Sequence, residues 1–273
     1  MTDYRLLWNS EAASPWVELD HLVGAMFQPF EEMLVGAAAA GRPRSVLDVG
    51  CGTGGLAVAI ARETGASCVG VDVSSAMVAA ARERARRAGV DVEFVEADAQ
   101  VHQFDADGFD LVVSRFGVMF FADPVAAFAN LRKGARANTG MRLVVWRSLT
   151  ENPFMTTADH AAAPLLPDLP AKRDGEPGQF GMADADHVRA VLGGSGWTDV
   201  ELHPVDVVCT LPLADLPRYV GRFGTVGRAL QTADDVLRAR LLDTVLPAFD
   251  PFVDGDEVRF TAACWSVAAQ AGE

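Results

Sequence analysis

The stretch "VLDVGCGTGG", Val46 to Gly55, joins an apolar run to a glycine-rich turn and holds one carboxylate, that of Asp48. Such a run is typical of a parallel strand whose carboxyl end turns tightly around a ligand and into a helix. The glycines at positions 50, 52 and 55 fit the G-x-G-x-x-G loop that holds a dinucleotide pyrophosphate. Asp48 with glycines at positions 50, 52 and 54 fits a different loop. The stretch therefore predicts a crevice and leaves its ligand open.

Asp48 separates the two interpretations. It lies two positions before the first glycine, where a dinucleotide loop usually has an apolar side chain. A carboxylate there would repel a pyrophosphate, since two like charges about 4 Å apart cost about 4 kcal/mol at an effective dielectric constant of about 20. For a cationic ligand the sign reverses, so Asp48 favours a positively charged ligand.

The surrounding pattern predicts an α/β fold. From about residue 45 to 148, short β-branched runs alternate with alanine-rich helical segments, as in parallel strands joined by helical crossovers. Helices are expected at 56–65 and 74–89, with serine N-caps before the second and Gly65 and Gly89 closing them. Two later strands complete an expected seven-stranded, mostly parallel, Rossmann-like sheet with helices on both faces. The strands are "SVLDV", "CVGVDV", "VEFVE", "FDLVVS", "MRLVVW", "TDVELHPVDVVCTL" and "RFTAACWSVAAQ".

Four segments are expected along the chain. Residues 1–40 form an amphipathic N-terminal helical arm, and 41–150 form the ligand-binding core. Residues 151–182, rich in proline, glycine and aspartate, are interpreted as a mobile, lid-like surface segment. Residues 183–273 complete the sheet and carry a helical cap insertion at about 212–252.

Further polar residues follow the next strands of the expected sheet. Asp72 ends the second strand, where an acidic side chain accepts hydrogen bonds from ribose hydroxyls. Asp98, beside Ala99, ends the third, and Ser114 and Arg115 follow the fourth. Each acid could instead cap the following turn. Together these residues predict a nucleoside-binding crevice.

In this combination, the motifs resemble those of class I, Rossmann-like S-adenosylmethionine-dependent methyltransferases over about residues 40–148. "SRFGVMFFADPVAAFANL" and the start "WNSEAASPW" are similar to small-molecule enzymes akin to the ubiquinone and menaquinone C-methyltransferases. One departure is "KGARANTGMRL", where that family usually has a Pro-Gly-Gly turn. The resemblance implies that S-adenosylmethionine is the cofactor and S-adenosylhomocysteine the product. The implied cofactor-binding residues are Asp48, Gly50, Gly52, Gly54, Asp72, Val73, Met77, Asp98, Ala99 and Ser114.

Composition narrows the classes of partner. The formal net charge of −14 over 273 residues argues against nucleic acid and against an anionic membrane surface. The sequence has no run of about 18 apolar residues, its first ten residues lack a basic region followed by an apolar stretch, and the four cysteines are far apart. We therefore expect a cytoplasmic protein that binds a small-molecule acceptor and no metal, and that could form a homodimer.

Acceptor-binding and catalytic residues are less well defined by the sequence. Arg115 could meet an anionic substrate or form a structural ion pair. The acceptor-site candidates are Tyr4, Trp8, Phe27, Arg115, Met119 and Phe154, with Phe30 and Phe223 as further aromatic candidates; the candidate general bases are His21, His160 and Tyr219.

The functional expectation is in-line transfer of a methyl group to a small, aromatic or natural-product acceptor. Its main alternatives are an NAD(P)-dependent oxidoreductase and a non-catalytic cofactor-binding protein. The sequence does not indicate whether carbon, oxygen or nitrogen is methylated.

Overall fold

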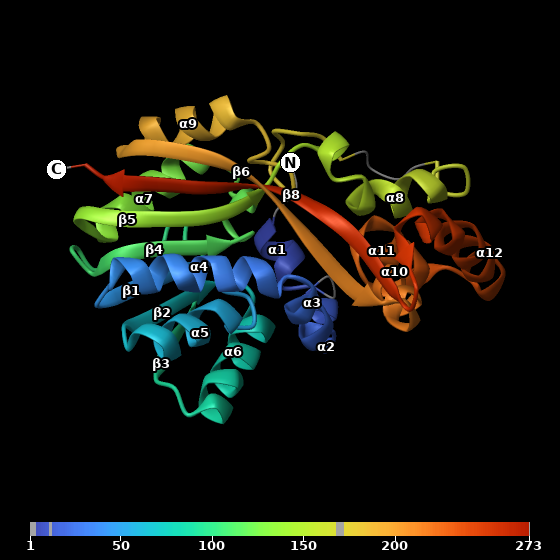
Figure 1. Cartoon of the computed structure of the whole chain (residues 1–273), viewed down its shortest axis with the longest axis horizontal. Helices are drawn as coiled ribbons and strands as arrows, with labels where there is room; N and C mark the ends of the chain where they lie inside the picture. Colours follow the sequence, from blue (N-terminus) through green and yellow to red (C-terminus); the bar gives the residue numbers. More distant parts are fainter. Residues whose placement is uncertain (1–3, 11–12, 168–171, 273) are drawn as a thin grey trace.

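A computed structural model of the chain describes residues 4–10, 13–167 and 172–272. Its centre is a single sheet in the order β3-β2-β1-β4-β5-β8-β6, with a short β7 paired to β8 (Figure 1). The sheet thus has eight strands rather than the seven expected, because residues 253–254 fold back on the start of β8. Residues 1–3, 11–12 and 168–171, assigned above to the arm and the lid, and residue 273 lie outside the described residues.

The first five strands are parallel, and the crossover helices expected from the sequence lie between them along the chain. In chain order they are β1 (Ser45–Val49), α5 (Gly55–Thr64), β2 (Ser67–Asp72), α6 (Ser75–Ala88), β3 (Val92–Glu96), β4 (Phe109–Arg115), α7 (Pro124–Gly134) and β5 (Ala135–Trp146). The expected glycine caps are confirmed, since φ is +70° at Gly65 and +65° at Gly89. Ser74 occupies the N-cap position of α6, but its buried hydroxyl makes no hydrogen bond among the described residues.

The strand order places a switch point between β1 and β4. From β1 the chain winds outward through α5 and α6 to β2 and β3, whereas from β4 it winds the other way through α7 to β5. Because parallel crossovers are right-handed, α5 and α6 cover one face and α7 the other. The carboxyl ends of β1 and β4 diverge to opposite faces, which opens a crevice between them.

Antiparallel strands complete the other side of the sheet. After α9 (Ala185–Gly194), β6 (Trp197–Pro212) pairs with β8 (Glu257–Ala271), which also pairs with β5. Both strands extend beyond the parallel strands and carry a helical cap at their far end (Figure 1). The cap consists of η4 (Leu213–Asp215), α10 (Leu216–Arg222), α11 (Gly224–Thr232), α12 (Asp235–Val245), η5 (Leu246–Phe252) and β7 (Val253–Asp254).

Among the described residues, four α-helices precede the sheet: α1 (Tyr4–Trp8), α2 (Ser14–Glu18), α3 (Asp20–Met26) and α4 (Gln28–Gly41). In α4, Phe30, Leu34 and Ala38 follow one another at four-residue spacing and are buried against the sheet and α5. Phe30 is therefore a core residue rather than part of an acceptor site. The shorter helices α1, α2 and α3 lie between the sheet and the cap (Figure 1).

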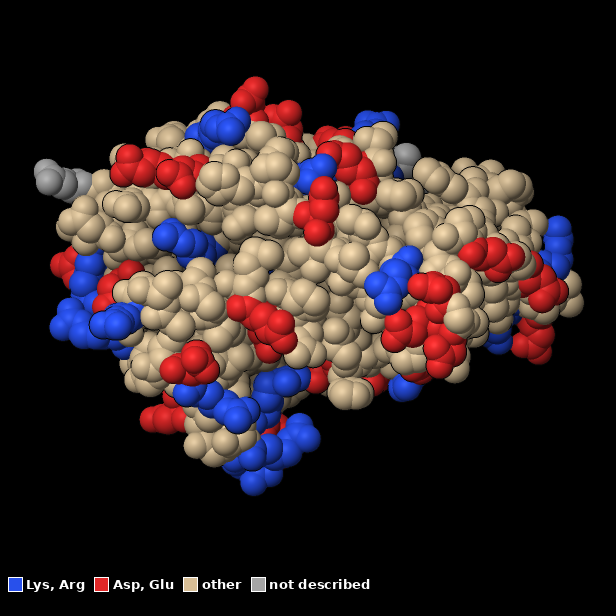
Figure 2. All heavy atoms as spheres, viewed as in Figure 1, with Lys and Arg blue, Asp and Glu red and all other residues tan. Residues whose placement is uncertain are grey.

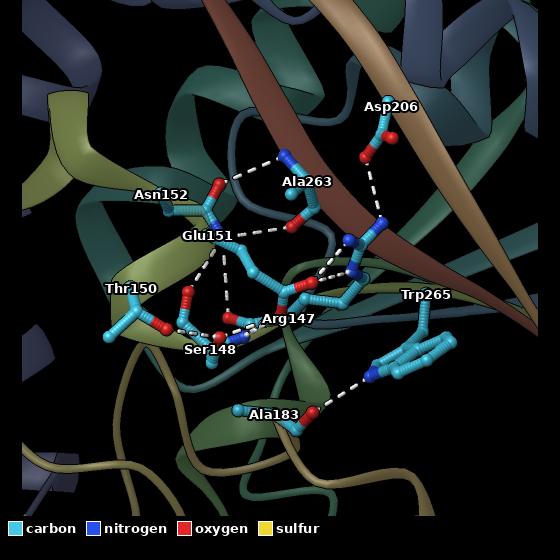
Figure 3. Close-up of polar contacts among 9 residues, drawn as sticks. All are labelled: Arg147, Ser148, Thr150, Glu151, Asn152, Ala183, Asp206, Ala263 and Trp265. Carbon is cyan, nitrogen blue, oxygen red and sulfur yellow. Dashed lines mark hydrogen bonds and ion pairs between the residues drawn. The ribbon is translucent and has the colours of Figure 1, made fainter.

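Beyond β5, the first part of the expected lid forms a helix and is anchored at its start. A short turn, η3 (Leu149–Glu151), leads into α8 (Pro153–Ala162). The side chain of Asn152, 1% exposed, donates to the Ala263 carbonyl oxygen and accepts from the Ala263 N–H, both at 2.9 Å (Figure 3). Arg147 forms ion pairs with Glu151 and Asp206 beside this contact. The start of the segment is thereby fixed to β8.

The surface reflects the acidic composition. Acidic side chains are spread over the visible face, and basic ones gather near α6 (Figure 2). No helix among the described residues is long and apolar enough to cross a membrane.

Candidate functional site

The glycine loop leaves β1 with positive φ angles at its three alternate glycines. The angles are +66° at Gly50, +55° at Gly52 and +79° at Gly54. A Cβ atom on Gly50 would lie 2.6 Å from Gly117 Cα, and one on Gly54 would lie 2.7 Å from the Phe94 ring. At Gly52 the nearest atom would be Met77 Sδ at 3.9 Å. Packing therefore requires glycine at 50 and 54, whereas the space before Gly52 is open to a ligand.

Asp48 lies beneath this loop with one carboxylate oxygen unpaired. The side chain is 1% exposed, and Oδ2 has no hydrogen-bond partner among the described residues. Burial raises the pKa of Asp48 to about 7; the Arg115 guanidinium opposes this rise, while Asp72 and Glu31 add to it. A buried, unpaired carboxylate oxygen on the wall of a cavity suits a ligand that brings positive charge.

Asp72 joins the end of β2 to the glycine loop. Its Oδ2 accepts a hydrogen bond from the Gly52 N–H at 2.8 Å, and Oδ1 accepts one from the Ser74 N–H at 2.9 Å. Burial raises the pKa of Asp72, while the backbone donors of Ser74, Gly52 and Val73 oppose the rise. Asp72, Val73 and Met77 all lie on the cavity wall.

Asp98 closes the turn after β3. Its Oδ1 accepts hydrogen bonds from the backbone N–H of Gln100 at 3.0 Å and from the Gln100 side-chain amide at 3.1 Å. Asp98, Ala99 and Gln100 contribute to the same wall as Asp72.

The end of β4 closes the opposite side of the crevice. Ser114 is fully buried; its hydroxyl donates to the Val49 carbonyl oxygen at 2.7 Å and accepts from the Gly117 N–H at 3.1 Å. It ties β4 to β1, and its own side chain is not on the cavity wall, unlike Arg115, Phe116 and Gly117.

Arg115 and Phe116 differ in how they are held. Arg115 Nη1 lies 3.5 Å from Glu31 Oε2 and donates to the Phe27 carbonyl oxygen at 3.4 Å, so the structural ion pair considered above exists. Phe116 has a φ angle of +64°, which is unusual for an aromatic residue, and its ring stacks on Trp146 with centroids 4.8 Å apart. Such strained conformations cluster at functional sites.

These strand ends open into one cavity of about 690 Å³. This is within the volume range of small-molecule sites. At one end are the glycine loop and the acids that follow β1, β2 and β3. The other end lies among the N-terminal helices, α8 and the cap, and is rich in aromatic side chains, including Trp8, Trp16, Phe27, Trp146, Phe154 and Phe223.

A comparison with known families identifies the segment that carries the acidic end. Residues 46–138 match the family model described as a methyltransferase domain. The match begins in the glycine-loop strand and includes Asp48, Asp72 and Asp98 with their strands. The chain carries a class I, Rossmann-like methyltransferase domain.

Relatives of the methyltransferase domain include enzymes of known type. The demethylmenaquinone methyltransferase of Thermus thermophilus is 40% identical over 104 residues, 38% of this chain and 46% of the relative. The aklanonic acid methyltransferase DauC of Streptomyces sp. is 34% identical over 113 residues, 40% of this chain and 51% of the relative. The chain spans about half the length of the curated relatives it matches.

The fold extends beyond the domain match. The crystal structure of the YcgJ protein of Bacillus subtilis is similar over 89% of this chain and 98% of that chain, with a TM-score of 0.59 and 18% identity. At 18% identity, this similarity shows a shared fold only. The first and last parts of the chain thus belong to the same architecture as the methyltransferase domain.

The structure places most acceptor candidates around the domain's cavity. Trp8, Phe27, Arg115, Met119 and Phe154 lie on its wall, as does Phe223. Tyr4 begins α1, but its side chain is outside the described residues. Of the candidate bases, Tyr219 lies on the wall, whereas His21 and His160 are exposed and are not among the wall residues.

Sequence reasoning missed the contacts that fasten the N-terminal helices to the methyltransferase domain. Thr53 Oγ1 donates to Asp20 Oδ1 at 2.5 Å, and Arg84 forms an ion pair with Asp20. Asn9 Nδ2 donates to the Val73 carbonyl oxygen at 2.8 Å. No sequence spacing connects these residues, although the amphipathic pattern of the arm indicated that it must pack on something.

Proposed function

We propose that the protein is an S-adenosylmethionine-dependent methyltransferase that acts on a small, aromatic or natural-product acceptor. The observation that carries the proposal is the single cavity that joins acidic strand ends to an aromatic chamber. One end suits a cationic nucleoside, and the other suits an apolar ring. Both are needed when one ligand donates a group to the other.

The proposed cofactor roles follow the strand ends. The unpaired Oδ2 of Asp48 supports a role toward the positively charged methionine portion, and the open space before Gly52 supports close approach of the cofactor to the backbone. Asp72 would hold the ribose, and Asp98 with Ala99 would hold the adenine. Val73 and Met77 would pack on the adenosine. Gly50, Gly54 and Ser114 would act by shaping the loop, since packing or hydrogen bonds within the protein occupy them.

S-adenosylmethionine supplies an electrophilic methyl group on a sulfonium. The tasks left to the protein are to align the acceptor and to exclude water. The arm and α8 supply walls for that purpose: hydrogen bonds hold the arm to the domain, and Asn152, just before α8, is hydrogen-bonded to β8. We propose that residues 1–40 act as an arm, 151–182 as a lid and about 212–252 as a cap.

No side chain of the chamber is proposed as a general base. Tyr219 lies on the wall, but burial raises its pKa, which opposes loss of its proton. The exposed positions of His21 and His160 do not support a direct role. The acceptor would therefore be a nucleophile that loses its proton readily.

Calorimetry with S-adenosylhomocysteine and with NAD tests the cofactor proposal. We expect binding of S-adenosylhomocysteine and none of NAD; the reverse pattern would favour an oxidoreductase. Incubation with S-adenosylmethionine and a panel of phenols, quinols and aromatic acids then tests turnover through formation of S-adenosylhomocysteine. Tight cofactor binding without turnover over the panel would favour a non-catalytic role.

We also propose a cytoplasmic location, which the four buried, unpaired cysteines support. Cell fractionation tests it. A homodimer stays a prediction, and light scattering of the purified protein tests it.

A further inference from the structure

The two ends of the cavity differ in the polar groups that lack partners. At the cofactor end the unpaired atom is a carboxylate oxygen, Asp48 Oδ2. At the cap end, where α10 meets α11, the groups with a missing or weak partner are donors: those of Arg222, Arg228 and Tyr219, all on the cavity wall. The ligands of the two ends should therefore differ in charge.

Arg222 ends α10 and is only partly satisfied. Its Nη2 forms an ion pair with Glu18 of α2, whereas its Nε is buried and has no hydrogen-bond partner among the described residues. Buried donors without an acceptor are rare in native proteins and call for an explanation, such as a ligand.

Arg228 lies six positions further along the chain, on α11. Among the described residues no carboxylate lies within 4 Å of its guanidinium, in contrast to Lys172, Arg173 and Arg222 on the same cavity wall. Lys172 Nζ is 2.9 Å from Asp159 Oδ2, and Arg173 Nη1 is 3.3 Å from Glu176 Oε1. Arg228 is exposed and lies on the cavity wall, so its guanidinium is accessible to an anionic group in the cavity.

Tyr219 adds a third donor, one turn before Arg222. Its hydroxyl donates to Met155 Sδ at 3.9 Å, and a thioether sulfur is a weak acceptor. The centroids of its ring and that of Phe223 lie 5.3 Å apart, and both rings line the same cavity as Arg222 and Arg228. The cap end thus combines an aromatic surface with hydrogen-bond donors and positive charge.

We propose that the methyl acceptor is an apolar ring compound that carries an anionic oxygen group, a carboxylate or an ionised phenol, and that Arg222 and Arg228 hold this group. The inference rests on the proposed function, because it assumes that the cap end receives the acceptor. Tyr219 donates a further hydrogen bond to an oxygen of the same molecule. The proposal assigns opposite charges to the two ligands of one cavity.

Binding of matched probes to the full chain loaded with S-adenosylhomocysteine tests the proposal. We expect 2-naphthoate to bind about tenfold or more tightly than 2-naphthamide, because hydrogen bonds to charged groups are roughly twice as strong as neutral ones. Arg228→Gln should remove most of that preference. The matched control is Arg218→Gln, since Arg218 is an exposed arginine of α10 outside the cavity wall, and it should leave the preference unchanged.

A second pair of variants tests the contribution of Arg222 to probe binding separately from that of Arg228. Arg222→Gln should weaken 2-naphthoate binding, whereas Glu18→Gln, which removes only the counter-ion, should not weaken it. Tighter binding of 2-naphthol than of 2-naphthoate, at a pH where the naphthol ionises, would identify the phenolate as the recognised group. Equal binding of 2-naphthoate and 2-naphthamide, or binding of neither, would overturn the inference.

The two proposals fail in different ways. If wild-type protein does not bind S-adenosylhomocysteine, the proposed function fails. If it binds S-adenosylhomocysteine but does not prefer an anionic probe, only the acceptor proposal fails.

Discussion

The Oδ2 atom of Asp72 accepts a hydrogen bond from the backbone N–H of Gly52 at 2.8 Å. This contact joins the acid at the end of β2 to the middle of the glycine loop after β1. The Asp72 carboxylate therefore has two tasks in our proposal: it orders the loop and it is available to the ribose.

Replacement of Asp72 by alanine should weaken binding of S-adenosylhomocysteine about tenfold or more, since hydrogen bonds to a charged group are worth about 1.5–3 kcal/mol. Calorimetry at constant pH measures the effect. Glu93→Ala, which removes an exposed acid of β3, is the control and should bind as the wild type does. Unchanged affinity in Asp72→Ala would show that the ribose is held elsewhere.

Asp48 should make cofactor affinity depend on pH. Its pKa is about 7 because of burial, so the carboxyl is partly protonated near neutrality. A cationic ligand favours the ionised form, so affinity should fall as the pH decreases below about 7, by up to tenfold per unit. Above pH 8, where Asp48 is ionised, this group should no longer change the cofactor affinity.

Asp48→Asn separates this effect from titration of the ligand's own amine. The variant should bind the cofactor more weakly at pH 8. It should also lose the part of the pH dependence of affinity that arises from Asp48. Because the folded-state pKa lies above the unfolded value of 3.8, ionisation destabilises the free protein as the pH rises toward and through 7. Asp48→Asn should therefore melt higher than the wild type at pH 8 and similarly at pH 4. A melting difference that was the same at both pH values would contradict the assignment.

Two glycines of the loop should respond differently to alanine. Gly54→Ala would place a Cβ 2.7 Å from the Phe94 ring at a φ angle of +79°, so the free energy of unfolding should fall by about 2–5 kcal/mol. Gly52→Ala meets no close protein atom and should cost about 1–2 kcal/mol, the penalty of its positive φ angle. Its main effect should be weaker cofactor binding. Denaturant titration and calorimetry on both variants measure the two effects, and equal stability losses would refute this division.

The hydrogen bonds between the Asn152 side chain and the Ala263 backbone should contribute to the free energy of unfolding. Asn152→Ala leaves the N–H of Ala263 without its partner, whereas the Ala263 carbonyl oxygen keeps the hydrogen bond from the Arg147 N–H at 3.0 Å; an unsatisfied buried group costs about 1–3 kcal/mol. We expect a loss of about 1–3 kcal/mol in the free energy of unfolding. Thr150→Ala, at an exposed position two residues earlier, should change it by less than about 0.5 kcal/mol. A loss in Asn152→Ala no larger than in this control would show that water replaces the amide.

The parallel half of the fold was predictable because its signals are local. Alternation of β-branched strands with alanine-rich helices, and glycines at helix ends, specify crossovers without reference to distant residues. The start of β5 was less predictable. The sequence suggested a strand from Met141, whereas β5 begins at Ala135 and passes through Asn138 at a φ angle of +62°. Pairing with β4, with an irregular register between Phe109 and Leu111, sets that start.

The sequence by itself determined the ends of the strands and the acids at them, because a glycine turn and the carboxylate before it are encoded within ten residues. Only the tertiary structure decided which side chains face the cavity. Ser114, which is adjacent to the crevice in sequence, is turned inward to join β1 and β4, whereas Arg222 and Arg228 arrive from more than 100 residues away. Packing of the cap against the arm brings them there, and no local pattern encodes a contact between segments so far apart along the chain.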